Sequence, residues 1–102
     1  MSENPRLTHA TLKVLACMMA RGQSEISGSE VAVVTKLASG SLYPILLRLE
    51  RAGWLKSRWE KIDPKQSGRP RRRLYKITAT GAAEMRAAVS EIMPQGDLSW
   101  AF

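Results

Sequence analysis

The stretch that decides the fold is residues 39–53, SGSLYPILLRLERAG. Its apolar side chains recur at the i, i+3, i+4, i+7 spacing of one helix face: Leu42, Ile45, Leu46 and Leu49. A face of this kind must pack against a core. Pro44 is tolerated only in the first turn of a helix, which favours Ser41 over Ser39 as the residue that caps the helix. The helix is expected to end at Gly53.

Two further helices are expected before this one. Residues 8–20 have apolar side chains at helical spacing, with Thr8 as the N-cap and Gly22 as a stop. Residues 29–36 show a shorter pattern that is typical of a second helix. A tight connection through residues 37 and 38 joins this helix to the next, which is the arrangement of a helix-turn-helix.

Two segments that resemble strands follow these helices. Residues 54–62 and residues 73–78 alternate apolar and polar side chains, as half-buried strands do. The residues between them, 63–72, include two prolines and a glycine, so we expect an extended tip that contains no helix. Together these segments predict a two-stranded hairpin.

A last helix is expected from Ala79 to about Ile92, with Thr78 as its cap and Pro94 beyond its end. The order helix, helix, helix, strand, strand, helix predicts a mainly α-helical chain with a small two-stranded β-hairpin. This is a winged helix-turn-helix: a three-helix core, a hairpin that forms the wing, and a C-terminal helix.

The positive charge of the chain is concentrated in one segment. Residues 48–76 contain eleven Lys or Arg and three Asp or Glu, whereas the other residues contain five basic and six acidic side chains. The net charge of +7 therefore comes from this segment alone. Such clustering is what a surface that binds a polyanion requires, and we expect double-stranded DNA as the partner. A basic surface that serves only solubility is the alternative.

Composition argues against several other classes of protein. Cys17 is the single cysteine and lies in an apolar helical pattern, so we expect a buried core residue. His9 is the single histidine, and no Cys or His pair has metal-ligand spacing, so no enzyme, metal site or cofactor is predicted. No apolar run has the length of a membrane span, and we expect a cytoplasmic protein. Trp54, Trp59 and Trp100 are expected to close the core, with a platform for planar ligands as the alternative.

Two groups of side chains are expected to contact DNA, because phosphates supply affinity and base edges supply sequence preference. The first group lies on the helix of residues 39–53 and in the turn before it: Lys36, Ser39, Ser41, Tyr43 and Arg48. Hydroxyls and N–H groups at a helix start suit a phosphate, although each serine could also be no more than a helix cap. The second group lies in the hairpin tip, a run without an acidic residue whose guanidinium groups suit phosphate: Lys65, Arg69, Arg71, Arg72 and Arg73.

Two motifs resemble the PadR family of bacterial transcription regulators. Residues 40–44, Gly-Ser-Leu-Tyr-Pro, are similar to that family's recognition-helix signature, and residues 68–72, Gly-Arg-Pro-Arg-Arg, are similar to its wing. The resemblance implies a homodimeric repressor that binds an inverted repeat, with one recognition helix and one wing in each half-site. It also implies that Tyr43 touches phosphate and that the arginines after Gly68 form the wing contact. Leu47 departs from the pattern, because a basic residue is common there.

The C-terminal part of the chain is expected to form the dimer. Residues 1–78 would be the DNA-binding domain and residues 79–102 a dimerisation segment, although the last helix is short for the family. The side chains expected at the dimer contact are Met85, Val89, Ile92 and Trp100. The alternative function is a winged-helix module that binds a protein partner through its apolar tail. A small-molecule effector is compatible with the family, but no residue indicates one.

Overall fold

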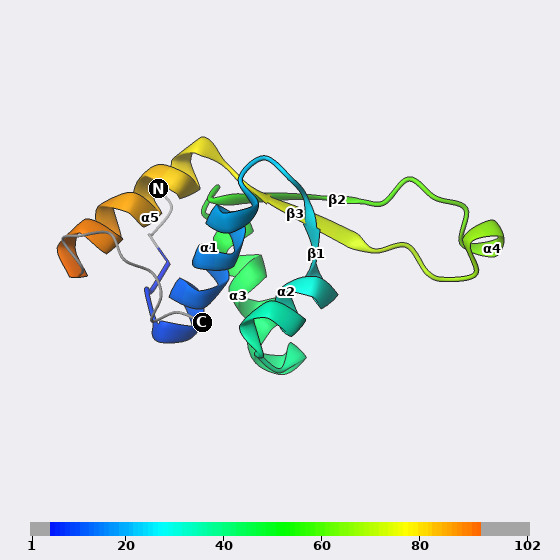
Figure 1. Ribbon diagram of the computed structural model, residues 1–102, viewed down its shortest axis with the longest axis horizontal. Helices are drawn as coiled ribbons and strands as arrows, with labels where there is room; N and C mark the ends of the chain where they lie inside the picture. The colour runs from blue at the N-terminus through cyan, green and yellow to red at the C-terminus, as the bar shows by residue number, and fades with distance from the viewer. Residues whose placement is uncertain (1–4, 93–102) are drawn as a thin grey trace.

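A computed structural model describes residues 5–92 of the chain, with the side chain of Ile92 left aside. Its elements are α1 (His9–Arg21), β1 (Ile26–Ser27), α2 (Gly28–Thr35), α3 (Ser39–Arg51), β2 (Leu55–Trp59), α4 (Pro64–Ser67), β3 (Arg73–Ile77) and α5 (Ala79–Ile92). Figure 1 shows α1, α2 and α3 gathered at the centre, the β2–β3 hairpin reaching away as an arm, and α5 at the opposite end from α4. This is the winged helix-turn-helix that the order of elements predicts.

The core forms where α1 and α3 pack together beneath the sheet. All four side chains of the predicted α3 face are buried, at 0–5% exposure. The other elements add further fully buried side chains: Leu15 and Met18 from α1, Ile26 from β1, Val31 from α2, Leu55 from β2 and Met85 from α5. Cys17 is also buried, and this burial raises the pKa of its thiol, so the prediction of a core cysteine is confirmed.

The starts of α1 and α2 follow from side-chain caps. Thr8 caps α1, because its hydroxyl accepts a hydrogen bond from the Thr11 N–H at 3.1 Å, as predicted. Ser27 and Glu30 form a reciprocal capping box, so α2 begins at Gly28, one residue earlier than expected. The pair α2 and α3 is bent by 118° across the short turn, close to the angle of a helix-turn-helix. Within residues 5–92, no single helix has the length and apolar character needed to cross a membrane.

The start of α3 differs from the prediction. The helix begins at Ser39 with Ala38 as its N-cap, and no side chain caps it, so the expected cap by Ser41 is wrong. The Ala38 carbonyl accepts hydrogen bonds from the N–H groups of both Ser41 and Leu42, which closes the first turn without a side chain. Pro44 therefore lies inside the helix, where it removes the one backbone hydrogen bond that would reach the Gly40 carbonyl.

The sheet contains one more strand than expected. The predicted hairpin is present, with Leu55 opposite Ile77 and Trp59 opposite Arg73. The short strand β1 adds to the other edge of β3, with Ile26 opposite Tyr75, so the order is β1-β3-β2 and the sheet is three-stranded and antiparallel. A strand of two residues is too short to show an alternating pattern, which is why the sequence does not reveal it.

The wing tip also contains a turn of helix, and the expectation of a tip without helix is wrong. Asp63 caps α4, since its carboxylate accepts a hydrogen bond from the Lys65 N–H at 3.0 Å, and Pro64 occupies the first helical position. Gly68 ends the turn in the left-handed region, at φ 69°. Proline at a helix start and glycine just past its end are ordinary helix boundaries, so the turn-forming residues of the tip are compatible with one helical turn.

The tryptophans divide between core and surface. Trp54 is buried at 3% exposure, as expected of a residue that closes the core. Trp59 is 59% exposed, so the core interpretation is wrong for this residue, which lies at the outer end of β2. Trp100 lies outside the described residues.

The start of α5 is fastened to the turn between α3 and β2. The Thr78 hydroxyl donates to the Gly53 carbonyl at 2.7 Å and accepts from the Gly81 N–H at 3.0 Å, which confirms Thr78 as the cap. Gly81 lies directly against the Trp54 carbonyl, with no room for a Cβ. Glycine is therefore required here by close packing of one backbone on another.

This packing predicts opposite effects for two glycine substitutions. Gly81→Ala would overlap backbone atoms of Trp54, and we expect the free energy of unfolding to fall by about 1–3 kcal/mol, the usual cost of overpacking. Gly40→Ala is the matched control, because a Cβ there meets nothing within 4 Å and alanine favours a helix. Urea denaturation measures both variants, and an equal loss of stability in the two would contradict this account.

Candidate nucleic-acid interface

The exposed side of α3 presents the residues that were predicted there. Ser39, Ser41, Tyr43 and Arg48 are all exposed, on the two flanks of the helix beside its buried face. Lys36 ends α2 in the left-handed conformation at φ 62° and is exposed in the turn before α3. Among residues 5–92, neither Lys36 nor Arg48 has an acidic partner within ion-pair distance. These cations are therefore available to a ligand.

Tyr43 is held against the first turn of α2. A Cβ added at Gly28 would come within 2.9 Å of both Cε1 and Oη of Tyr43, so the absence of a side chain at Gly28 admits the ring. Tyr43 stays 45% exposed, and within the described chain its hydroxyl makes no hydrogen bond. The hydroxyl is thus set beside the backbone N–H groups at the α2 start, a position that suits a phosphate oxygen.

The wing arginines lie near Tyr43 and the start of α2. A cleft of about 310 Å³ is lined by residues of α2, α3 and the wing: Ser27, Gly28, Ser29, Tyr43, Trp59, Arg71, Arg72 and Arg73. Tyr43 comes from α3, the serines from the end of β1 and the start of α2, and the arginines from the first residue of β3 and the two residues before it. The helix start and the basic ribbon therefore share one surface.

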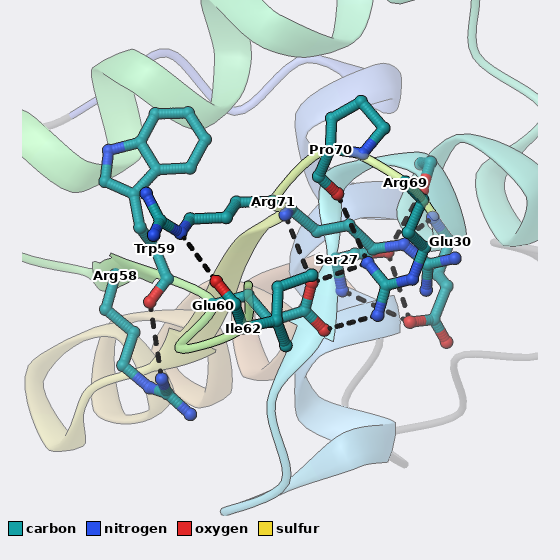
Figure 2. A network of polar contacts seen from close by, with 11 residues as sticks. Ser27, Glu30, Arg58, Trp59, Glu60, Ile62, Arg69, Pro70 and Arg71 are labelled. Atoms are coloured by element: carbon teal, nitrogen blue, oxygen red, sulfur yellow. Dashed lines mark hydrogen bonds and ion pairs between the residues drawn. The ribbon is translucent and has the colours of Figure 1, made fainter. Parts of the chain in front are cut away.

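The base of the wing tip is clamped by Glu60. Its carboxylate accepts hydrogen bonds from Arg69 Nη1 at 2.6 Å and Nη2 at 2.9 Å, and from the Arg72 backbone N–H at 3.2 Å (Figure 2). The hydrogen bond from Arg69 is the main reason that the pKa of Glu60 falls to about 2. The tip itself contains no acidic partner for its arginines, but the end of the opposite strand supplies one.

Arg73 is likewise held by the chain rather than free. Its Nε donates to Ser57 Oγ at 3.0 Å, and Ser57 in turn donates to Glu50 Oε2 at 2.5 Å. Its Nη2 lies 3.8 Å from the same Glu50 oxygen, and its guanidinium carbon lies 5.1 Å from the centre of the Trp59 ring. These contacts tie the wing to the last turn of α3, which carries Glu50.

Arg71 and Arg72 keep their guanidinium groups more open. Arg71 Nε donates to the Ile62 carbonyl at 3.0 Å, which orients the side chain and leaves its two terminal nitrogens for a ligand (Figure 2). The Arg72 side chain makes no hydrogen bond or ion pair with residues 5–92. Lys65 lies on α4, farther out along the wing, and lines no part of the cleft around Tyr43.

The expected dimer residues fall in two groups. Met85 and Val89 are buried in the core of this chain, at 1% and 7% exposure, so neither presents its side chain to a second copy in this conformation. The Ile92 side chain and Trp100 lie outside the described residues.

Several residues of the interface are absent from the sequence-based prediction. Ser27 and Ser29 line the cleft, and the Ser-x-x-Glu spacing of residues 27–30 is the signal that predicts a helix start there. Trp59 and Glu60 shape the wing through contacts across strands, and no local pattern indicates them. In the part of the chain that the structure describes, no group of three or more His, Cys, Asp or Glu could hold a metal ion.

The model of the transcriptional regulator PadR-like family matches residues 24–87, which include the helix-turn-helix, the wing and most of α5. The chain belongs to this family. Among solved structures, it is similar to a PadR-like transcription factor from Bacteroides fragilis, with 22% identity, TM-score 0.63, and coverage of 85% of this chain and 87% of that one. No curated protein matches the chain.

The PadR-like chain also resembles MarR from E. coli. Wild-type MarR in its apo form shares 24% identity at TM-score 0.70 over 88% of this chain and 61% of that one. A MarR mutant complexed with operator DNA shares 26% identity at TM-score 0.64, with coverage of 87% and 60%. The chain thus spans about three-fifths of the length of the MarR chains that it matches, and the likeness shows the winged-helix fold.

The clamp predicts an unusual titration of Glu60. Its carboxyl should titrate with a midpoint at about pH 2 in the folded chain, against an ordinary value of 4.5. Because the pKa is lowered on folding, the clamp is fully stabilising above pH 4.5 and is lost as the pH falls towards 2. Arg69→Gln should move the midpoint back towards 4.5, as measured by NMR of the side-chain carboxyl. Arg71→Gln is the control, since that guanidinium does not touch Glu60, and equal midpoints in the two variants would refute the clamp.

Proposed function

We propose that this PadR-like regulator is a transcriptional repressor that binds an inverted DNA repeat as a homodimer. The observation that carries the proposal is the cleft in which Tyr43, the start of α2 and the wing arginines meet. A nucleic-acid role requires these features to lie on one surface, because the recognition helix and the wing must contact one duplex together. The likeness to a MarR mutant complexed with operator DNA supports the same interpretation.

The cleft has the chemistry of a phosphate site. The N-terminus of α2 presents the positive end of a helix dipole and the backbone N–H groups of its first turn, of which the Glu30 N–H is already bonded to Ser27 Oγ. The Tyr43 hydroxyl lies beside it, and the Arg72 guanidinium lines the same space. We infer that one DNA phosphate occupies this cleft, which would fix the register of α3 in the adjoining major groove.

The basic residues of the wing divide into two roles under this proposal. Arg69 and Arg73 are positioning residues, since Glu60 and Glu50 already hold them within the chain. Arg71, Arg72 and Lys65 are the wing residues that would contact DNA. On α3 and in the turn before it, Lys36, Ser39, Ser41 and Arg48 are exposed and would contact the duplex directly. Pairing with Glu60 and Glu50 therefore lowers the number of cations available to phosphates. The same pairs fix the position of the wing that carries the other cations.

The salt dependence of binding tests this division. Arg72→Gln should weaken binding to a preferred duplex and to random duplex by the same factor, and it should reduce the slope of log K against log salt by about 0.9 if one phosphate contact is lost. Arg86→Gln is the matched control, because α5 lies at the far end of the molecule from the wing tip, and it should leave the slope unchanged (Figure 1). Fluorescence anisotropy over a series of salt concentrations measures both. An unchanged slope in Arg72→Gln would remove Arg72 from the interface, and absence of any binding would remove the proposed function.

The dimer is tested by stoichiometry. A duplex with two inverted half-sites should bind two chains, and a duplex with a single half-site should bind more weakly, because the second chain adds its own contacts. Deletion of residues 93–102 should weaken assembly on the inverted repeat if the C-terminal segment joins the copies. Analytical ultracentrifugation of chain and duplex measures this. One chain per inverted repeat at saturation would contradict the homodimer.

A further inference from the structure

The ridge of α3 that lies farthest from the core is largely apolar. An α-helix turns by about 100° per residue, so the ridge opposite the buried face can be found from the sequence numbers. The residues on that ridge are Gly40, Pro44, Leu47 and Arg51, and all four are exposed. A helix that entered a major groove would bring this ridge closest to the base edges.

Leu47 is the most prominent apolar residue on this ridge. Its side chain is 47% exposed and has no place in the core cluster of the described chain. Pro44 lies one turn earlier on the same side, so the two side chains form a continuous apolar strip. An exposed leucine alone would need no explanation, but this one lies at the centre of the surface that faces the proposed ligand.

Gly40 extends this strip towards the helix start. A Cβ at this position would meet nothing within 4 Å, and the residue does not have a positive φ. Neither packing nor backbone conformation within the described chain requires glycine here, although alanine is more favourable in a helix. Close approach of another molecule's surface is a remaining physical reason for glycine.

The ridge offers little for recognition of bases by hydrogen bonds. It contains no Asn or Gln, and its one cation, Arg51, lies in the last turn. Tyr43 is turned towards α2 and so is not directed at the bases. The direct contact that an aliphatic side chain can make with a base edge is with the C5-methyl group of thymine, which projects into the major groove.

We propose that Leu47, beside Pro44, recognises a thymine C5-methyl group in each half-site, and that Gly40 allows α3 to approach the bases closely. The inference rests on the proposed function and adds a specificity-determining residue to it. Charge favours DNA over an apolar protein surface as the occupant. Arg48 and Arg51 flank the strip, and neither has an acidic partner within residues 5–92.

The test removes single methyl groups from the DNA. A duplex is selected from random sequence by the full chain, and each thymine is then replaced in turn by deoxyuridine, which lacks only the C5-methyl. At one thymine in each half-site, we expect the affinity of the wild-type chain to fall by about fourfold, the value of one buried methyl group. Leu47→Ala should weaken binding to the thymine duplex by at least as much, and it should show no further loss on the deoxyuridine duplex.

The controls separate this inference from the proposed function. Val33→Ala changes a side chain of α2 that is 76% exposed, and it should keep the full response to deoxyuridine. Circular dichroism should show that Leu47→Ala remains folded, because the residue lies outside the core. If the chain prefers a duplex but Leu47→Ala responds to deoxyuridine as the wild type does, the thymine contact is refuted while the repressor proposal stands. If no duplex is preferred over random DNA, both fail.

Discussion

The arginines of the wing repel one another, and the structure of the wing depends on how this repulsion is reduced. Glutamates from outside the tip pair with some of these arginines and so reduce it. Glu60 holds Arg69, Glu50 and Ser57 hold Arg73, and Glu25 accepts two hydrogen bonds from Arg58 at 2.7 Å each. Solvent screens exposed ion pairs of this kind, so they do not hold the fold together. Their effect is geometric: the pair of Glu50 with Arg73 joins the ribbon to α3, the pair of Glu25 with Arg58 joins it to the segment before β1, and the pair of Glu60 with Arg69 fixes the wing tip. The buried face of α3 supplies the stability, and the pairs determine where the remaining charge is presented.

The sequence predicts this structure best where a pattern is local and repeated. The four buried positions of α3 follow from spacing alone, since burial of one helix face leaves a periodic record in the chain. The hairpin strands follow from alternation of apolar and polar side chains, and the cap follows from a threonine, Thr78, directly before a helical pattern. The start of α3 could not be predicted from the sequence, because Ala38 closes the first turn through its carbonyl. A cap made by the backbone has no side-chain signature.

The interface could be predicted only in outline. The basic run of residues 65–73 indicates a polyanion ligand, but which arginines are free depends on pairs that lie far apart in the sequence. Glu50 of α3 and Arg73 of β3 are 23 positions apart, and they meet because α3 packs against β2 and β2 pairs with β3 in one register. The exposure of Trp59 depends in the same way on how far the sheet extends beyond the core, since Trp59 opposite Arg73 is the last pair of the hairpin. Cross-strand contacts of this kind require the register, and alternation alone does not determine it.

Affinity and specificity must come from different parts of this surface. The proposed phosphate contacts by Arg71, Arg72 and the α2 start would favour all duplexes alike, so they could not select an operator. One contact with a thymine methyl group would favour thymine over a base without that methyl by about fourfold, and two half-sites together by about sixteenfold. Specific regulators typically prefer their sites over non-specific DNA by about 10³ or more. The proposed Leu47 contact would therefore explain only part of the selectivity that the proposed repressor needs. The serines of α3 and the dependence of groove shape on sequence must supply the remainder, and the braced wing suits the second role, because only a ribbon held at a fixed position can respond to the width of a groove.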